Sequence, residues 1–296
     1  MVLPRRIVSL SPNVSMILFA LQADALVVGR TQTCVTAIEQ YLRAWDIPPQ
    51  TVAPRLDAWQ AIPAVGAWPV ADYEAIAALR PEAILTSGSG PYGVHEAHKL
   101  GVEPAALWHG DTRTLADLTQ HIQQLGALVG YAEAASALSA QLARRCQDAC
   151  ATPRRWPHAP TVLFEYCVCT QYDPDPERRV AQAAETVLVG GHLAPELIAL
   201  SGGRTLFVQP GDTARWVTRV EIQAAQPEVI LQYDCHGCPT ARRQPIATRP
   251  GWERLSAVAR AAVYPLHVNI SDPNLCFPEA LTHLDAIFRA DRPELP

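Results

Sequence analysis

A short unit that occurs twice constrains the fold of this chain more than any other feature of the sequence. In the first half, an amphipathic helical pattern stops before Pro81, and the apolar run Glu82–Thr86 follows. In the second half, a similar pattern stops before Pro227, and Glu228–Gln232 follows. The two prolines lie 146 residues apart, which is nearly half of the 296-residue chain. A helix, a proline stop and a buried strand in each half predict an α/β fold made of two similarly built lobes.

The pattern around this repeat gives the rest of the domain organisation. A long Ala-rich helical pattern continues after Gly130 towards Cys150, and a helix of about 20 residues spans ~30 Å. We therefore expect two Rossmann-like lobes joined by a long rigid α-helix, with a ligand cleft between the lobes. The predicted boundaries are an N-terminal α/β lobe 1–130, a connecting helix 131–152, a C-terminal α/β lobe 153–275 and a C-terminal helix 276–296.

Charge and apolar content exclude several classes of protein. With 24 basic and 29 acidic residues, the net charge of −5 gives no electrostatic basis for nucleic-acid binding. A hydrophobic content of 49% with 18% charged residues excludes a disordered chain. The first apolar run, Ile7–Leu10, ends at Ser11-Pro12 and is too short for an export signal. The most apolar later stretch, Met16–Leu21, is far short of the ~20 residues that a membrane span requires. We expect a soluble cytoplasmic protein without membrane insertion, or a periplasmic one if Met1 replaces a removed signal.

Residues that follow predicted strands are the candidates for ligand binding. Ligands of open α/β sheets bind beyond the carboxyl ends of the strands. Gly88 would let the backbone approach a ligand closely, although an ordinary turn is the alternative. Arg249 would meet a ligand carboxylate or phosphate, or else face solvent. The candidate ligand-binding residues, including aromatic side chains that could pack on a flat ligand, are Ser11, Asn13, Thr31, Ser87, Gly88, Tyr92, Tyr166, Trp216 and Arg249.

The eight cysteines divide into two groups by position. Cys146 and Cys150 lie on the Ala-rich helix and read as packing residues, while Cys276 stays ambiguous. The other five follow predicted strands, where ligand or metal contact, inert packing and disulfide formation all stay open: Cys34, Cys167, Cys169, Cys235 and Cys238. Cys235-x-x-Cys238 has the spacing of half a zinc or iron–sulfur site. Without an export signal, reduced thiols are favoured over disulfides.

No motif typical of a hydrolase, a phosphate-binding loop or a zinc protease occurs in the chain. The sequence therefore gives no evidence for these three activities. The best enzyme alternative is a metal-dependent activity in the cleft.

Several segments resemble the class III substrate-binding proteins of ABC importers for cobalamin, ferric siderophores and haem. The segments are Arg6–Leu21, Leu26–Thr31, Val65-Gly66, Ala78–Leu85, Glu196–Gly203, Gln226–Ile230 and Arg249–Val258. The resemblance implies a non-enzymatic protein that captures a metal-containing ligand, such as cobalamin, a corrinoid or a related chelate, in the inter-lobe cleft. It also implies an ABC permease as partner and an aromatic residue, Trp68, presented to the cleft.

The likeness is greatest to a cobalamin-binding-protein-like branch that often lacks an export signal. Cys34, the segment Gly191–Leu197 and Cys235-His236-Gly237 match that branch, and His192 is implied as a lower axial or metal ligand. The branch often has further cysteines where this chain has Ser87–Gly90, which puts a simple transfer of a metal site in doubt. The alternative hypothesis is a cysteine- and histidine-ligated metal or iron–sulfur cluster protein, used for binding, sensing or catalysis. Its ligands would be Cys34, Cys167, Cys169, His192, Cys235 and Cys238.

Overall fold

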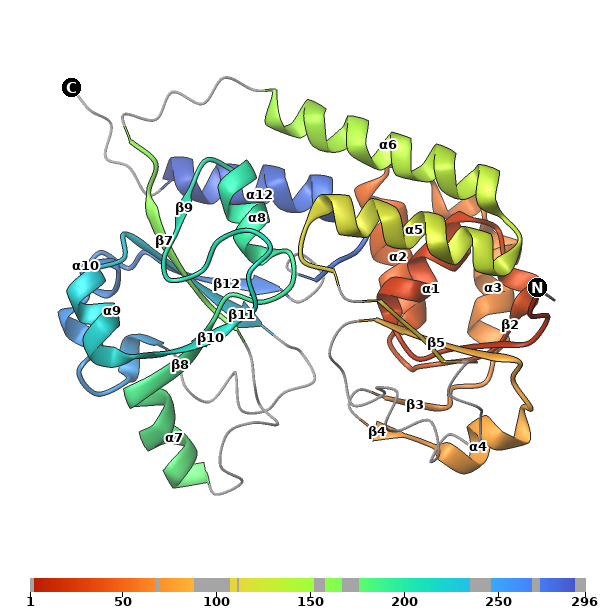
Figure 1. Ribbon diagram of the computed structural model, residues 1–296, viewed down its shortest axis with the longest axis horizontal. Helices are drawn as coiled ribbons and strands as arrows, with labels where there is room; N and C mark the ends of the chain where they lie inside the picture. The colour runs from red at the N-terminus through yellow and green to blue at the C-terminus, as the bar shows by residue number, and fades with distance from the viewer. Residues whose placement is uncertain are drawn as a thin grey trace. The chain divides into compact units, whose positions relative to one another are not determined.

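The computed structural model describes residues 3–67, 70–87, 107–110, 112–151, 158–166, 176–234, 246–267 and 272–290. The chain forms two compact units (Figure 1). Unit 1 comprises residues 1–145 and 273–278, and unit 2 comprises 146–272 and 279–296. Helix α6 (Ala132–Cys150) passes from the first unit into the second, so the two-lobed α/β organisation expected from the sequence is confirmed.

Within its described part, unit 1 is built on a parallel sheet with the strand order β2-β1-β5-β6. Its strands are β1 (Ile7–Ser9), β2 (Val27–Arg30), β5 (Ala83–Ser87) and β6 (Leu107–Gly110), with β3 (Gly66–Ala67) and β4 (Val70–Ala71) forming a separate antiparallel pair. Its helices are α1 (Pro12–Ala20), α2 (Cys34–Ala44), α3 (Ala53–Ala61), α4 (Tyr73–Ala78) and α5 (Leu115–Val129), with the short helical turns η1 (Asp24–Leu26) and η2 (Pro49–Thr51). Figure 1 shows α4 on one side of this sheet and α1 and α5 on the other.

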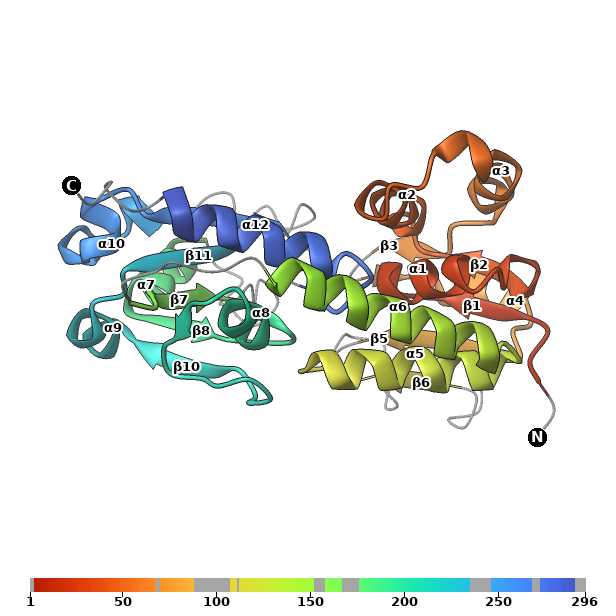
Figure 2. The same ribbon diagram turned by 90° about the horizontal axis from the view of Figure 1, so that it is seen from above.

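The faces of the unit 1 sheet follow from the period-2 alternation of side chains along a strand. Val8 and Ile84 pack on the α4 side with Ile76, and all three are buried. On the other side α5 and α6 lie close together, as Figures 1 and 2 both show. Glycine makes this approach possible, because a Cβ on Gly126 would stand 2.2 Å from that of Ala135.

The sheet of unit 2 is mixed, with the order β10-β8-β7-β11-β12 and β9 beside β7. Strands β7 (Thr161–Glu165), β11 (Val229–Asp234) and β12 (Val263–His267) are parallel, and β9 (Arg204–Thr205) pairs parallel with β7, whereas β8 (Thr186–Val189) is antiparallel to β7 and to β10 (Arg215–Thr218). The helices are α7 (Pro176–Glu185), α8 (Ala194–Leu200), α9 (Arg219–Ala225), α10 (Ser256–Ala259) and α12 (Phe277–Ala290), with turns η6 (Ile246–Thr248) and η7 (Trp252–Arg254). The sequence did not indicate β8 and β10.

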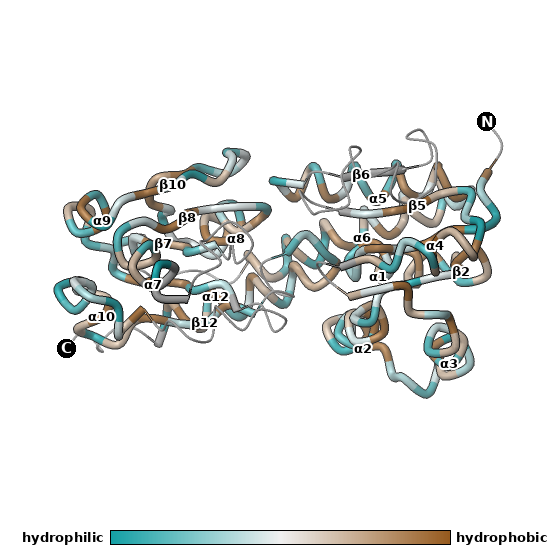
Figure 3. The backbone as a smooth tube through the Cα atoms, turned by 90° about the horizontal axis from the view of Figure 1, so that it is seen from below, coloured by the Kyte–Doolittle hydropathy of each residue, from teal (hydrophilic) through white to brown (hydrophobic). Residues whose placement is uncertain are grey.

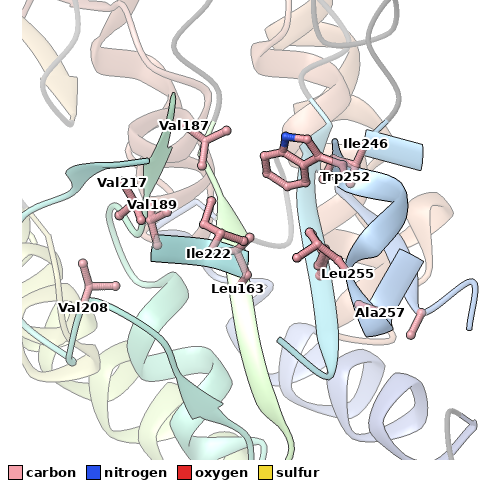
Figure 4. Packing of buried hydrophobic residues seen from close by; sticks show 12 residues of the cluster. Leu163, Val187, Val189, Val208, Val217, Ile222, Ile246, Trp252, Leu255 and Ala257 are labelled. Carbon is pink, nitrogen blue, oxygen red and sulfur yellow. The ribbon is translucent and has the colours of Figure 1, made fainter. Parts of the chain in front are cut away.

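One face of the unit 2 sheet carries a buried apolar cluster. Figure 4 shows Ile222 of α9 beside Leu163 of β7, with Val217 and Val189 to one side and Trp252 to the other. The amphipathic pattern of α9 explains its place, since Figure 3 shows hydrophobic and hydrophilic residues alternating along it. Apolar packing in this cluster holds α9 and η7 against the sheet.

The repeated unit of the sequence is confirmed as a repeat of backbone structure. Helix α4 and strand β5 in unit 1 correspond to α9 and β11 in unit 2. A residue in the left-handed region follows each helix within two positions, Arg80 with φ 44° and Gln226 with φ 46°. Each of these residues precedes the proline of the repeat, Pro81 or Pro227. A similar sequence therefore turns the chain from helix to strand in a similar way in both units.

Candidate functional site

Sequence-predicted residues in unit 1 gather at the carboxyl ends of β1 and β5. In the order β2-β1-β5-β6 the chain reverses its direction of winding between β1 and β5, and such a switch point is where open sheets bind ligands. Ser11 is the N-cap of α1, and half-buried Asn13 lies in its first turn. Ser87 is the last residue of β5. Ser11 and Asn13 therefore follow β1, and Ser87 ends β5, the two strands that flank the switch point.

Cys34 lies in a buried network of hydroxyl groups next to this edge. The Ser15 hydroxyl donates to Ser9 Oγ (2.8 Å), and Thr31 Oγ1 lies 3.0 Å from Cys34 Sγ. Burial raises the pKa of the Cys34 thiol, against the lowering effect of hydrogen bonds from Ser15 and Thr31. A fully buried neutral thiol is the environment of an inert packing cysteine, one of the three readings left open by the sequence. Thr31 is buried with it.

Of the cysteines within the described ranges, Cys34, Cys146, Cys150 and Cys276 are not in disulfides. Cys146 is buried, and the Cys150 thiol donates to the Leu200 carbonyl at 3.7 Å. These contacts agree with the packing role expected for the helix pair. Cys276 is buried at the start of α12.

A cluster of aromatic rings lies at the carboxyl ends of β7 and β11 in unit 2. The Tyr166 ring centroid is 5.1 Å from that of Tyr233 and 5.4 Å from that of His192, both with edge-to-face geometry. Phe164 also belongs to the cluster, with its ring centroid 6.3 Å from that of Tyr233. Phe164 and Tyr233 are buried, whereas Tyr166 and His192 are half-buried. We call Phe164, Tyr166, His192 and Tyr233 the ring cluster.

His192 is held in the ring cluster by an unusual backbone turn. Gly190, Gly191 and His192 have φ angles of 82°, 117° and 45°. Glycine accepts such angles, but a histidine in the left-handed region costs conformational energy. The turn brings the imidazole of His192 against Tyr166, at the start of the segment that enters α8.

Tyr233 is the ring-cluster residue that the sequence did not indicate. The predicted strand ended at Gln232, but β11 continues to Asp234 and places Tyr233 beside Tyr166. The phenol of Tyr233 donates to Asp272 Oδ1 (3.0 Å), which fixes its ring. The available signal was the alternation of side chains along the strand, which continues from Leu231 to Tyr233 when the strand is extended beyond Gln232.

Arg249 is buried and paired within unit 2. Its Nη2 lies 2.8 Å from Glu165 Oε1 and 3.0 Å from Oε2, and both side chains are less than 10% exposed (5% and 7%). The guanidinium also lies over the Trp252 ring, 5.1 Å from its centroid. The charge that the sequence assigned to a ligand anion or to solvent is therefore engaged with a carboxylate of the protein itself.

Trp216 lies on the edge strand β10 and is 41% exposed. Trp59, in contrast, is fully buried and donates to Asp24 Oδ1 (2.6 Å). Several predicted site residues lie outside the described residues, namely Trp68, Gly88, Tyr92, Cys167, Cys169, Cys235 and Cys238. In the part of the chain that the structure describes, no group of three or more His, Cys, Asp or Glu side chains could hold a metal ion. Nor does any described helix have the length and apolar character needed to cross a bilayer.

Comparisons with known proteins agree with this architecture. The profile of the family described as "Periplasmic binding protein" matches residues 7–167. No match to a curated protein sequence was found. Similar solved structures include the periplasmic heme-binding protein RhuT from Roseiflexus sp. RS-1 (20% identity, TM-score 0.69) and the periplasmic vitamin B12 binding protein BtuF of Vibrio cholerae (19%, 0.61). An ABC transporter substrate-binding protein from Listeria monocytogenes EGD-e is similar as well (21%, 0.68). Each alignment covers 97% of this chain and 98% of the other.

Proposed function

This chain belongs to the periplasmic binding protein family, and on that premise we propose that it captures a flat metal-containing ligand, such as haem or a corrinoid. No bond is made or broken in this function. The ring cluster of unit 2 is the observation that carries the proposal. Of its two half-buried rings, Tyr166 lies just beyond the carboxyl end of β7, where α/β sheets bind their ligands, and His192 packs against it.

The chemistry of the cluster suits such a ligand. Aromatic faces pack on a macrocycle, and an imidazole nitrogen or a phenol oxygen is a known type of axial ligand to haem iron. Tyr166 and His192 supply both groups, and Tyr233 and Phe164 support them from the sheet. The heme and vitamin B12 binding proteins of similar fold support the ligand class.

Titration with haemin and with cyanocobalamin tests this proposal. We expect one of the two to bind with a change in its visible absorption spectrum, and His192→Ala to weaken that binding at least tenfold. His158→Ala is the matched control, because His158 lies in the same unit beside Glu228, before the start of β7, and is largely exposed. Failure of both probes to bind the unmodified protein, or equal loss in both variants, would contradict the proposal.

We further propose that the ligand is passed to an ABC permease. The family and the similar ABC transporter substrate-binding protein support this partner. The family name also supports a periplasmic site of action rather than the cytoplasmic one first expected from the sequence. Release of the protein from cells by osmotic shock would support the periplasmic site, and its retention with a cytoplasmic marker would contradict it.

A further inference from the structure

Three separate segments of unit 2 meet at the carboxylate of Glu165. This residue ends β7, directly before Tyr166. Gln232, its neighbour in register on β11, donates from Nε2 to Glu165 Oε2 (3.3 Å). Arg249 reaches the same carboxylate from the segment after η6, at 2.8 and 3.0 Å. One buried carboxylate therefore ties two adjacent strand ends to the segment that follows η6.

We call Glu165, Gln232 and Arg249 the polar group, and it lies on the face of the sheet opposite the ring cluster. Side chains alternate between the two faces of a strand, so Glu165 points away from Phe164 and Tyr166, and Gln232 points away from Tyr233. Arg249 accordingly stacks on Trp252, which belongs to the apolar cluster shown in Figure 4. The ring cluster and the polar group thus lie on opposite faces of the sheet, at the same ends of β7 and β11.

Stability alone does not account for an ion pair in this place. Removing both charges from water costs free energy, and replacing a buried pair by apolar residues of similar size is often neutral or stabilising. What directional bonds add is a fixed geometry, and the bonds here hold the last pair of the β7–β11 ladder, Glu165 and Gln232, whose neighbours Tyr166 and Tyr233 carry the rings.

We propose that Glu165 is a positioning residue for ligand binding, which holds Tyr166 and Tyr233 at the spacing the ligand needs. The inference rests on the proposed function of the ring cluster. Glu165 itself does not touch the ligand. It acts through the backbone of the two strands, with Arg249 and Gln232 as its partners.

A double variant, Glu165→Leu with Arg249→Met, tests this role without leaving a buried charge unpaired. We expect a melting temperature close to that of the unmodified protein but at least tenfold weaker binding of whichever probe binds, haemin or cyanocobalamin. Glu165→Gln keeps one acceptor oxygen and should give an intermediate loss, and it serves as the test if the double variant does not fold. Glu228→Gln is the matched control, because Glu228 bonds His158 and Thr161 at the opposite end of the same sheet.

A readout that needs no ligand separates this inference from the proposed function. The ring proton resonances of His192, assigned by their loss in His192→Ala, report its contact with Tyr166 through the ring current. They should shift in the double variant and stay in place in Glu228→Gln. Unchanged resonances and unchanged affinity in the folded double variant would overturn the positioning role while leaving the proposed function intact. If neither probe binds the unmodified protein, the proposed function fails, and the resonances alone decide the role of Glu165.

Discussion

The Tyr166 ring lies directly against the backbone of Gly191, so that a Cβ added to the glycine would stand 3.1 Å from Cγ and Cδ2 of the tyrosine. Gly191 is therefore required twice, by its φ of 117° and by the closeness of the ring.

We expect Gly191→Ala to displace Tyr166 from His192 and to lower the free energy of unfolding by about 1–3 kcal/mol. Gly130→Ala is the control, since Gly130 also has a positive φ (85°) but meets only the flexible end of Leu3 in unit 1. Both variants should lose stability in urea unfolding, and only Gly191→Ala should lose ligand affinity. Equal affinity in the two variants would show that the ring does not need its place against Gly191.

Tyr41 makes the protein sensitive to alkaline pH. Burial raises the pKa of Tyr41 to about 12 from the usual 10.0, against the lowering effect of Arg55 and Arg145. The unfolded chain gives up this proton near pH 10 and the folded protein holds it, so the stabilisation is complete below pH 10 and is lost as the pH rises towards 12. We expect a loss of about 2–3 kcal/mol in the free energy of unfolding over this range.

Tyr41→Phe should flatten this alkaline decline in urea unfolding measured from pH 8 to 12. The raised pKa of Cys34 acts in the same direction, so Cys34→Ala should flatten a further part. A decline of unchanged steepness in Tyr41→Phe would contradict the assignment.

Glu228 makes the free energy of unfolding depend on pH in the opposite sense, with a loss of stability at acid pH. Burial opposes the ionised carboxylate, but hydrogen bonds from His158 and Thr161 outweigh it and lower the pKa of Glu228 from 4.5. Its stabilising contribution is therefore complete above pH 4.5 and is lost as the pH falls through the lowered value. We expect Glu228→Gln to be less stable at neutral pH and to show a shallower acid decline below pH 4.5. Thermal unfolding at several pH values measures both, and an unchanged acid decline would refute it.

Trp45 and Leu275 are joined by a hydrogen bond across 230 residues of sequence. The indole Nε1 of Trp45 donates to the Leu275 carbonyl (2.7 Å) within unit 1, where both residues are buried. Trp45→Phe leaves that carbonyl without this donor and should cost about 1–3 kcal/mol in urea unfolding. Trp216→Phe, on the exposed edge strand β10, should stay within about 0.5 kcal/mol of the unmodified protein. A similar cost in both variants would mean that ring volume, and not the hydrogen bond, decides the effect.

The parts of the fold that could be predicted are those with strong local signals. The repeat around Pro81 and Pro227 predicted two helix–strand units, and Gly130 marked the boundary between α5 and α6. Residues 36–63 have weaker local signals, because a proline can either end a helix or begin one. Pro54 lies in the first turn of α3, where its missing N–H costs nothing.

The missed elements have weak local signals. Strand β8 follows α7 at once, with no glycine or proline between them, and β10 is a short edge strand with two of its residues polar. Placement of site residues was predictable only as far as strand ends. Ser11 and Tyr166 were indicated in this way and His192 by the family resemblance, but no local pattern shows that Arg249 pairs with a carboxylate 84 residues earlier. Contacts of that range are set by the topology of the sheet.

The bond between Trp45 and Leu275 also has a consequence for biosynthesis. Residues 273–278 complete unit 1, yet the ribosome makes all of residues 146–272 before it reaches them. At about 5–20 residues per second, nascent unit 1 waits roughly 6–25 s with the indole of Trp45 and its surroundings uncovered. During this interval unit 1 is incomplete and exposes apolar surface, as folding intermediates do. It would therefore be a substrate for chaperones.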